Sequence, residues 1–397
     1  MRRIFLKFYN GGAILEKLSC LREKIDMIDE EIVKLFEERM DIVCKVAEYK
    51  KQNSMEILNA KRENQVIEMQ LNNLKNKSIE KETEELLKHI MYISRSLQSK
   101  LLKDDDINFE KYKNNFKIGS EKAPLVGFQG VPASFSHEAL IKYFGEDTEV
   151  LNFKSFKDVF EALKNGDIQY GILPIENSST GGITEVDDLL RKYNFYIVGE
   201  KCLKVDHNLL VTKDAEASDI KEVYSHAQAF LQSSKFFEEN DDWMLIPYLN
   251  TAQSAKYVSE ENNKSKACVA SKKAAELYGL KIIEENINYN NNNYTRFIII
   301  APEIEVNKEC NKVSIVIALP HKVGTLYNIT RHFYNNNLNM TKIESRPVVN
   351  KSWEYFFYID FNGNMQDEST INALKEIEKE SIYFKLLGNY KSDCNVK

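Results

Sequence analysis

The chain has 397 residues, a formal net charge of −6 and an isoelectric point near 5.8. This length predicts two to four domains, each large enough to bury its own core. The mild acidity argues against nucleic-acid binding, so an anionic substrate must be bound by local groups of Arg and Lys. Six scattered cysteines without a Cys-x-x-Cys pair, and histidines without ligand spacing, predict a reducing cytosol and no metal site.

No targeting or membrane segment is expected. The basic, apolar N-terminus lacks the uninterrupted apolar core and cleavage site of a signal peptide. The sequence also lacks an apolar run of the ~18 residues that a membrane-spanning helix needs. We therefore expect a cytoplasmic protein that interacts with neither membranes nor nucleic acids.

A heptad pattern marks the first long segment of the chain. Its apolar positions alternate in spacings of four and three: Ile14, Leu18, Leu21, Ile25, Ile28, Ile32 and Leu35. The pattern predicts a helix from residue 14 to about 52, roughly 58 Å long at ~1.5 Å per residue. Two shorter helices, expected at 59–74 and 78–102, cannot cover it within one subunit. We therefore expect an intertwined dimer.

Several polar residues lie in register with the apolar positions of these helices, namely Arg39, Lys50, Glu63, Ser94 and Gln98. A buried charge needs a partner because its desolvation is costly. An internal salt-bridge network, with Arg39 or Lys50 paired to Glu63, would explain each residue taken singly. Taken together, cations outnumber anions on this face, so a bound anion is the better explanation.

Residues 14–102, including LREKID at 21–26, resemble the all-helical chorismate mutases. The resemblance implies that Arg22 reaches a substrate carboxylate in the partner subunit's site, while Arg39 holds a carboxylate from within. Lys50 and Gln98 would hydrogen-bond the ether oxygen of the breaking bond. The substrate-binding set that it implies is Arg22, Arg39, Lys50, Asn59, Arg62, Glu63, Ser94 and Gln98. The family often has Asp where this chain has Asn59.

A second candidate site begins with residues 171–182, which read GILPIENSSTGG. An apolar strand is followed there by hydroxyls, an amide and a carboxylate beside two glycines. A helix expected near Thr184 would direct its free N–H groups toward an anion at the end of this strand. A polar turn with a helix cap explains this segment equally well when it is taken alone.

Three further motifs occur along the chain: VGFQG at 126–130, YSH at 224–226 and YTRF at 294–297. With them, residues 124–302 resemble prephenate dehydratase, which implies that Thr295 is the essential hydroxyl. Arg296 would be available for a carboxylate and Phe297 would shape the ring pocket. The other substrate-binding residues implied by the resemblance are Glu176, Asn177, Ser225 and Gln232. The chain has Ala133 and Ala227 where the family has Gly and Pro, and His226 is interpreted as a structural hydrogen bonder.

The last block, from about Cys310, is predicted as strand 313–319, helix 323–334, strands 340–348 and 353–361, helix 367–379 and strand 383–387. This βαββαβ order is the ferredoxin-like plan. LPHKVGTL at 319–326 and ESRP at 344–347 resemble the ACT regulatory domain over residues 311–391. The resemblance implies that L-phenylalanine binds across a subunit interface at Gly324, Thr325, Leu326, Glu344, Ser345 and Arg346. A dimerisation module without a ligand is the alternative.

The resemblances imply a multidomain chain with an all-α domain at 14–103 and a linker at 104–122. A two-lobed, periplasmic-binding-like α/β domain would follow at 123–302, and an α+β ACT domain at 311–391. The implied function is a cofactor-free chorismate mutase and prephenate dehydratase of phenylalanine biosynthesis, a homodimer or larger, inhibited by phenylalanine. A non-catalytic sensor of small acids fits the α/β pattern but leaves Thr295 unexplained. A narrower alternative treats the helical block as a degenerate dimeriser.

Overall fold

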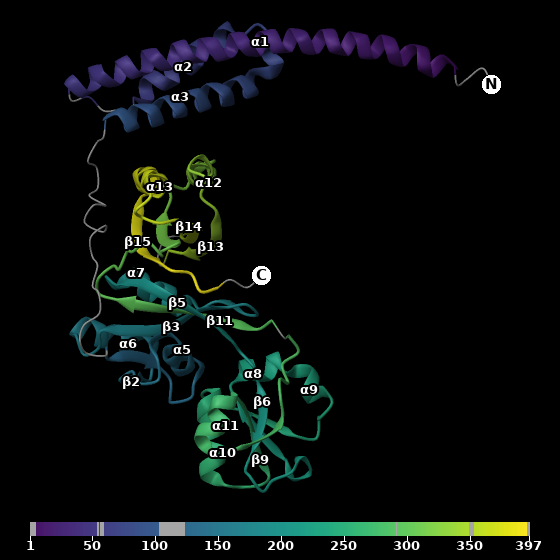
Figure 1. Ribbon diagram of the computed structural model, residues 1–397, viewed down its shortest axis with the longest axis vertical. Helices are drawn as coiled ribbons and strands as arrows, with labels where there is room; N and C mark the ends of the chain where they lie inside the picture. The colour runs from purple at the N-terminus through teal and green to yellow at the C-terminus, as the bar shows by residue number, and fades with distance from the viewer. Residues whose placement is uncertain are drawn as a thin grey trace. The chain divides into compact units, whose positions relative to one another are not determined.

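A computed structural model of the chain describes residues 5–53, 55, 59–102, 124–290, 292–348 and 353–394 (Figure 1). The chain divides into two units, residues 1–106 and 107–397. The linker predicted at 104–122 lies outside the described residues. Among the described residues, no helix is both long and apolar enough to cross a membrane.

The first unit consists of α1 (Phe5–Gln52), α2 (Ala60–Asn73), the short 3₁₀ turn η1 (Lys77–Ile79) and α3 (Glu80–Leu102). Asn59 caps α2, because its side-chain oxygen accepts a hydrogen bond from the backbone N–H of Arg62 at 3.0 Å. Val43, Ala47 and Met91 form part of a small core where the helices meet. In contrast, the heptad stripe of α1 is largely exposed within one chain, with Leu21, Ile25, Ile28, Ile32 and Leu35 each 51–58% exposed.

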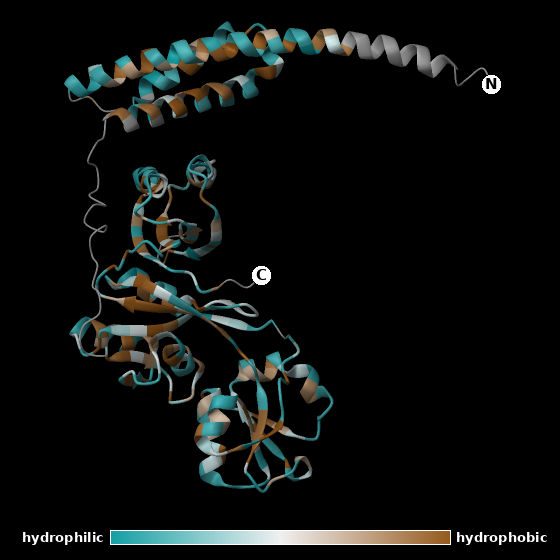
Figure 2. Cartoon of the chain, viewed as in Figure 1, coloured by the Kyte–Doolittle hydropathy of each residue, from teal (hydrophilic) through white to brown (hydrophobic). Residues whose placement is uncertain are grey.

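In the described part of the second unit, ten strands form the first sheet. Their order is β13-β14-β12-β15-β5-β11-β3-β1-β2, with β4 paired to β3. Their bounds are β1 (Val126–Gln129), β2 (Val150–Phe153), β3 (Tyr170–Asn177), β4 (Gly181–Gly182), β5 (Tyr196–Lys204), β11 (Tyr294–Ala301), β12 (Lys312–Ala318), β13 (Met340–Pro347), β14 (Tyr355–Asn362) and β15 (Tyr383–Tyr390). The helices against its first half are α5 (Phe135–Phe144), α6 (Phe156–Asn165) and α7 (Thr184–Lys192). Residues of α5 pack into one apolar cluster, and those of α6 and α7 into another. Figure 2 shows the apolar residues concentrated in the strands, as expected for a sheet covered by helices.

A smaller sheet forms the second lobe, in the order β10-β6-β9-β7-β8. Its elements are β6 (Asn208–Val211), η2 (Ala217–Asp219), β7 (Glu222–Ser225), α8 (Ala227–Gln232), α9 (Ser234–Glu238), β8 (Met244–Pro247), α10 (Thr251–Glu261), β9 (Lys266–Ala270), α11 (Lys272–Tyr278) and β10 (Lys281–Glu284). The chain enters this lobe after β5 and returns to the first sheet at β11 (Figure 1). The α/β region therefore has two lobes joined by two crossing segments.

The C-terminal block follows the order β12, α12 (Thr325–Asn335), β13, β14, α13 (Glu368–Glu380) and β15. Each of these elements begins and ends within three residues of its predicted bounds. The block is continuous with the α/β region, because β15 pairs with β5 at Gly388 and Ile197. The amide hydrogen bonds of one sheet therefore extend across both blocks, which the sequence pattern did not predict.

The C-terminal tail then lies along β5. The side chain of Asp393 accepts from the backbone N–H of Cys202 at 2.9 Å and pairs with Lys201 at 3.1 Å. A disulfide joins Cys202 to Cys394. The expectation of a reducing cytosol included no such pair, because 192 residues separate the two cysteines and only the returning tail brings them together.

The junction at Gly388 leads to a stability prediction. A Cβ atom added at Gly388 would lie 2.1 Å from the carbonyl oxygen of Ile197. Gly388→Ala should therefore force β15 away from β5 and destabilise the second unit by about 1–3 kcal/mol. Calorimetry should show its melting transition lowered by several degrees, with the transition of the helical unit unchanged as an internal control. An unchanged profile would contradict the close contact.

Candidate functional site

A cavity of about 180 Å³ lies among the three helices of the first unit. Polar side chains from all three helices and the cap of α2 line it, namely Arg39, Lys50, Asn59, Arg62, Glu63, Ser94, Arg95 and Gln98. The lining contains four cationic groups and one carboxylate. Because buried charge must be compensated, this cavity is suited to an anion with more than one negative group.

Short hydrogen bonds order part of this cavity. Arg39 Nη1 donates to Ser94 Oγ at 2.5 Å, and Arg95 Nη1 donates to Glu63 Oε2 at 2.5 Å. Gln98 is buried, and its side-chain oxygen has no hydrogen-bond partner among the described atoms. Burial lowers the pKa of Lys50, while Glu63 opposes that shift. The Lys50 ammonium and the guanidinium groups of this cavity can donate hydrogen bonds to a ligand in a site that is partly shielded from water.

The structure brings together seven of the eight mutase residues predicted from the sequence. Arg22 is the exception, because it lies exposed on α1 and outside the cavity lining. Arg95 lines the cavity but was not predicted. It follows Ser94 and lies four residues after Met91 on α3, so helical spacing carried a signal for it.

The second site centres on Thr295 of β11 and Asn177 of β3, which face each other as a cross-strand pair. Asn177 Nδ2 lies 2.9 Å from Thr295 Oγ1. The amide orientation is set because Asn177 Oδ1 accepts from the backbone N–H groups of Ser179 and Thr180, at 2.9 and 3.2 Å. Since Asn177 donates to Thr295, the threonine hydroxyl keeps its own proton for a different acceptor.

Further amide groups connect this pair to the second lobe. Asn177 Nδ2 donates to Asn293 Oδ1 at 2.8 Å, and Asn293 Nδ2 donates to Gln232 Oε1 at 3.0 Å. His207 Nε2 lies 2.8 Å from the same oxygen of Gln232. Burial lowers the pKa of His207 and favours the neutral ring, which can donate this bond. Asn293 and His207 were not predicted, although the asparagine-rich segment before β11 is visible in the sequence.

Four residues predicted for this site lie elsewhere. Ser225 is fully buried and donates to the carbonyl oxygen of Val269, while Phe297 belongs to the apolar core of the first sheet. Arg296 and Glu176 pair with each other at 2.7 Å on the opposite face of their strands. Successive side chains alternate across a sheet, so Arg296 cannot share the face of Thr295. The prediction that Arg296 binds a substrate carboxylate therefore needs correction.

His226 and Ala133 have clear local roles. The side chain of His226 caps α8, where Nδ1 accepts from the backbone N–H of Gln228 at 3.2 Å. This agrees with its interpretation as a structural hydrogen bonder. Ala133 has a φ of +65°, a conformation that glycine adopts more easily.

The residues predicted to bind an effector do not all face the same way. Gly324 has a φ of +82° and caps α12, followed by Thr325 and the partly exposed Leu326. On β13, Glu344 pairs with Lys342 at 3.1 Å and Arg346 with Asp188 of α7 at 3.5 Å. Ser345, between them, is exposed on the other face of the strand. Glu344 and Arg346 therefore face the α/β region within this chain.

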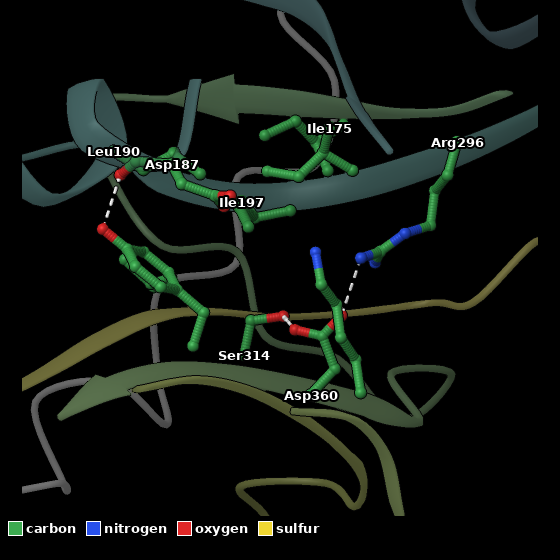
Figure 3. A pocket seen from close by; sticks show the side chains of 11 residues that line it. Ile175, Asp187, Leu190, Ile197, Arg296, Ser314 and Asp360 are labelled. Atoms are coloured by element: carbon green, nitrogen blue, oxygen red, sulfur yellow. Dashed lines mark hydrogen bonds and ion pairs between the residues drawn. The ribbon is translucent and has the colours of Figure 1, made fainter. Parts of the chain in front are cut away.

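A buried charged cluster joins the α/β region to the C-terminal block. Arg296 forms ion pairs with Glu176 of β3, Glu200 of β5 and Asp360 of β14, and Lys312 of β12 also pairs with Glu200 at 2.8 Å. Figure 3 shows Arg296 and Asp360 pointing toward each other beside a small cavity of about 10 Å³. The side chain of Asp187 lines the same cavity. Burial raises its pKa to about 7.

Possible metal ligands are dispersed in the part of the chain that the structure describes. Among these residues, no three His, Cys, Asp or Glu side chains lie close enough together to hold a metal ion. Asn177 and Thr295 present neutral hydrogen-bonding groups, and the helical cavity presents mainly cations. The first arrangement can bind a ligand through hydrogen bonds, and the second is suited to an organic anion.

Comparisons with known proteins match both units. A family model described as prephenate dehydratase matches residues 126–305, and one described as chorismate mutase type II matches residues 21–99. A relative from Buchnera aphidicola subsp. Acyrthosiphon pisum, named bifunctional chorismate mutase/prephenate dehydratase, is 31% identical over 95% of this chain and 97% of its own.

Two solved structures resemble the second unit. The prephenate dehydratase of Arthrobacter aurescens in complex with L-Phe has a TM-score of 0.63 at 26% identity, over 68% of this chain and 90% of that one. A quorum-quenching acylase, GqqA, has a TM-score of 0.62 at 26% identity, over 68% of this chain and 98% of that one. Since similar folds support different activities, the activity must be argued from the residues at the site.

Asp187 leads to a prediction about pH. Its raised pKa means that the folded state favours the protonated carboxyl, so its contribution to stability is present below about pH 4 and is lost as the pH rises through about 7. Asp187→Asn should therefore melt at a higher temperature than the parent by about 2 °C or more near neutral pH. Melting curves of the second unit at about pH 5.5 and about pH 8 should show the larger difference at the higher pH. Equal differences at both would contradict the assignment.

Proposed function

The chain belongs to the family of bifunctional chorismate mutase/prephenate dehydratases, and from this premise we propose which residues carry each reaction. As an enzyme of phenylalanine biosynthesis, it rearranges chorismate to prephenate and converts prephenate to phenylpyruvate. The alternative of a non-catalytic sensor is not supported by this membership. The helical cavity carries the assignment most directly, because seven residues assigned to chorismate from the sequence converge there.

In the mutase, the cavity among α1, α2 and α3 binds chorismate. Arg39 holds one of its two carboxylates, and Lys50 and Gln98 donate hydrogen bonds to the ether oxygen. The rearrangement breaks the C–O bond and forms a C–C bond in one pericyclic step, which needs no nucleophile or base. Catalysis therefore consists of holding a reactive conformer and stabilising the negative charge that develops on the ether oxygen.

The mutase works as an intertwined dimer. The apolar stripe of α1, from Leu21 to Leu35, is more than half exposed in one chain, although such residues are normally buried against a partner helix. A second copy of the chain would cover this stripe. The same pairing would carry Arg22, which lies outside its own cavity, into the site of the other subunit. The main role of the Asn59 side chain would be to cap α2 and not to bind the substrate.

In the dehydratase, Thr295 donates its hydroxyl proton to the departing hydroxyl group of prephenate and regains a proton from solvent water. The ring C–O bond breaks and water leaves, while the bond to the carboxylate breaks and releases carbon dioxide. The electron pair of that bond enters the ring, which becomes aromatic. The Asn177 amide supports Thr295 by donating to its oxygen, and Gln232 holds Asn293 behind the pair. This arrangement stabilises negative charge on the threonine oxygen as its proton leaves.

The C-terminal block is an ACT domain that binds L-phenylalanine and inhibits the dehydratase. Its βαββαβ order and the strand order β13-β14-β12-β15 support a ferredoxin-like plan. The relative from Arthrobacter aurescens was solved in complex with L-Phe. Among the predicted effector residues, those that are exposed or half-exposed in this chain are Gly324, Thr325, Leu326 and Ser345.

We place the division between the α/β and ACT domains at 302–311. We also place the enzyme in the cytoplasm.

The first test follows both products from chorismate, with and without L-phenylalanine. The parent should form prephenate and then phenylpyruvate, and phenylalanine should suppress the second product. Thr295→Ala should lower phenylpyruvate formation by at least about 100-fold, because it removes the proton donor, and should leave mutase turnover unchanged. Thr295→Ser, which keeps the hydroxyl, is the matched control. Equal loss of both activities in Thr295→Ala would contradict the assignment of separate sites.

Lys50 is tested through the kinetics of the mutase. Lys50→Met removes a donor to the ether oxygen, so turnover should fall by about 100-fold or more while KM changes much less. Steady-state measurements with chorismate check this expectation, with dehydratase activity on added prephenate as the control. A turnover number equal to that of the parent would exclude Lys50 from the reacting bond.

A further inference from the structure

Strands β3 and β11 carry two neighbouring cross-strand pairs, Thr295 with Asn177 and Arg296 with Glu176. Because side chains alternate across a sheet, the first pair faces the dehydratase site and the second faces the C-terminal block. The two pairs share the same backbone. A displacement of Arg296 or Glu176 therefore moves Thr295 or Asn177 as well.

Two residues of the C-terminal block form ion pairs with Arg296 and Glu176. Asp360 Oδ2 lies 2.8 Å from Arg296 Nη2, and Lys342 Nζ lies 3.1 Å from Glu176 Oε2. Arg296 Nε lies 2.7 Å from Glu176 Oε1, so the three contacts link the four side chains in a row. Figure 3 shows the guanidinium of Arg296 and the carboxylate of Asp360 meeting from opposite sides of the junction.

These contacts are shielded from water and fixed by further partners. The side chains of Arg296, Asp360 and Lys342 are only 6%, 11% and 15% exposed. Ser314 Oγ donates to Asp360 Oδ1 at 2.6 Å. Burial alone would raise the pKa of Asp360, but Arg296 and Lys342 lower it below its usual value. The Asp360 carboxylate is therefore charged, and low local polarity strengthens its ion pair with Arg296.

We propose that Lys342 and Asp360 are positioning residues for the dehydratase reaction. By holding Glu176 and Arg296, they set the placement of the Asn177 amide and the Thr295 hydroxyl on the other face of the same two strands. The inference rests on the assignment of Thr295 and Asn177 as the dehydratase site. It makes the C-terminal block part of the structural support of the active site.

This arrangement also supplies a route for regulation. Lys342 lies on β13 two residues from Glu344, and both side chains face the α/β region. A Cβ atom added at Gly182, just after the Asn177 turn, would lie 2.5 Å from the carboxylate of Glu344. A ligand that displaces β13 would therefore change the contacts of Lys342 with Glu176 and of Glu344 with β4. Both contacts adjoin the segment that carries Asn177.

The test compares Lys342→Met with Lys342→Arg in the full-length protein, using prephenate as the substrate. Lys342→Met should lower the dehydratase kcat by about 10-fold or more with KM changed much less, because the bound geometry of the reacting groups is altered. Lys342→Arg, which retains the cation, should recover most of the kcat. Asp360→Asn should behave like Lys342→Met, and mutase activity should equal that of the parent throughout.

The matched control is Lys385→Met. Lys385 also crosses the junction, but it donates only to backbone carbonyls near the end of α7, including that of Leu190 at 2.7 Å. This variant should lower the melting temperature of the second unit with kcat unchanged. The inference is overturned if Lys342→Met keeps a kcat within about twofold of the parent, or if Lys385→Met lowers kcat equally. An inactive parent would instead refute the proposed dehydratase function.

Discussion

The buried guanidinium of Arg296 is the interaction on which the second unit depends. A charge at this depth must be compensated, and its three carboxylate partners come from β3, β5 and β14. Removal of one partner from a buried ion network typically costs about 3–5 kcal/mol, because a charge is left uncompensated. Arg296 thus ties the C-terminal block to the α/β region at the strand that also carries Thr295. Glu200 extends the network through Lys312 and the backbone N–H of Asp393 in the tail.

The two proposed active sites differ in the chemical groups that line them. The proposed mutase cavity is lined by cations from three helices, which suits a dianionic substrate and a reaction that needs only a fixed conformer. The dehydratase site collects amides and a hydroxyl at the crossing between two lobes. Neutral donors can orient Thr295 without competing for its proton. One chain can therefore hold both sites, and the product of the first is the substrate of the second.

Helical residues were predicted more accurately than strand residues, for a geometric reason. A single period of 3.6 residues decides which side chains share a face, so Arg39, Lys50, Glu63, Ser94 and Gln98 could be placed together from spacing alone. In a sheet, neighbours come from distant segments, and one residue of offset reverses the face. The resemblance to prephenate dehydratase assigned both Thr295 and Arg296 to one site, whereas their adjacent positions on β11 place them on opposite faces of the sheet.

The sequence by itself determined the order of the helical, α/β and C-terminal blocks, and which polar residues of the helical block lie in register with its apolar positions. These features depend on local periodicity and short motifs, which act over a few residues. Tertiary structure alone decided the rest: the sheet that continues from β5 to β15, the Cys202–Cys394 pair, and the Asn293–Gln232–His207 contacts. It also decided that Arg296 faces the C-terminal block. Each of these contacts joins residues far apart in the chain, and only the folded arrangement of strands brings such residues within bonding distance.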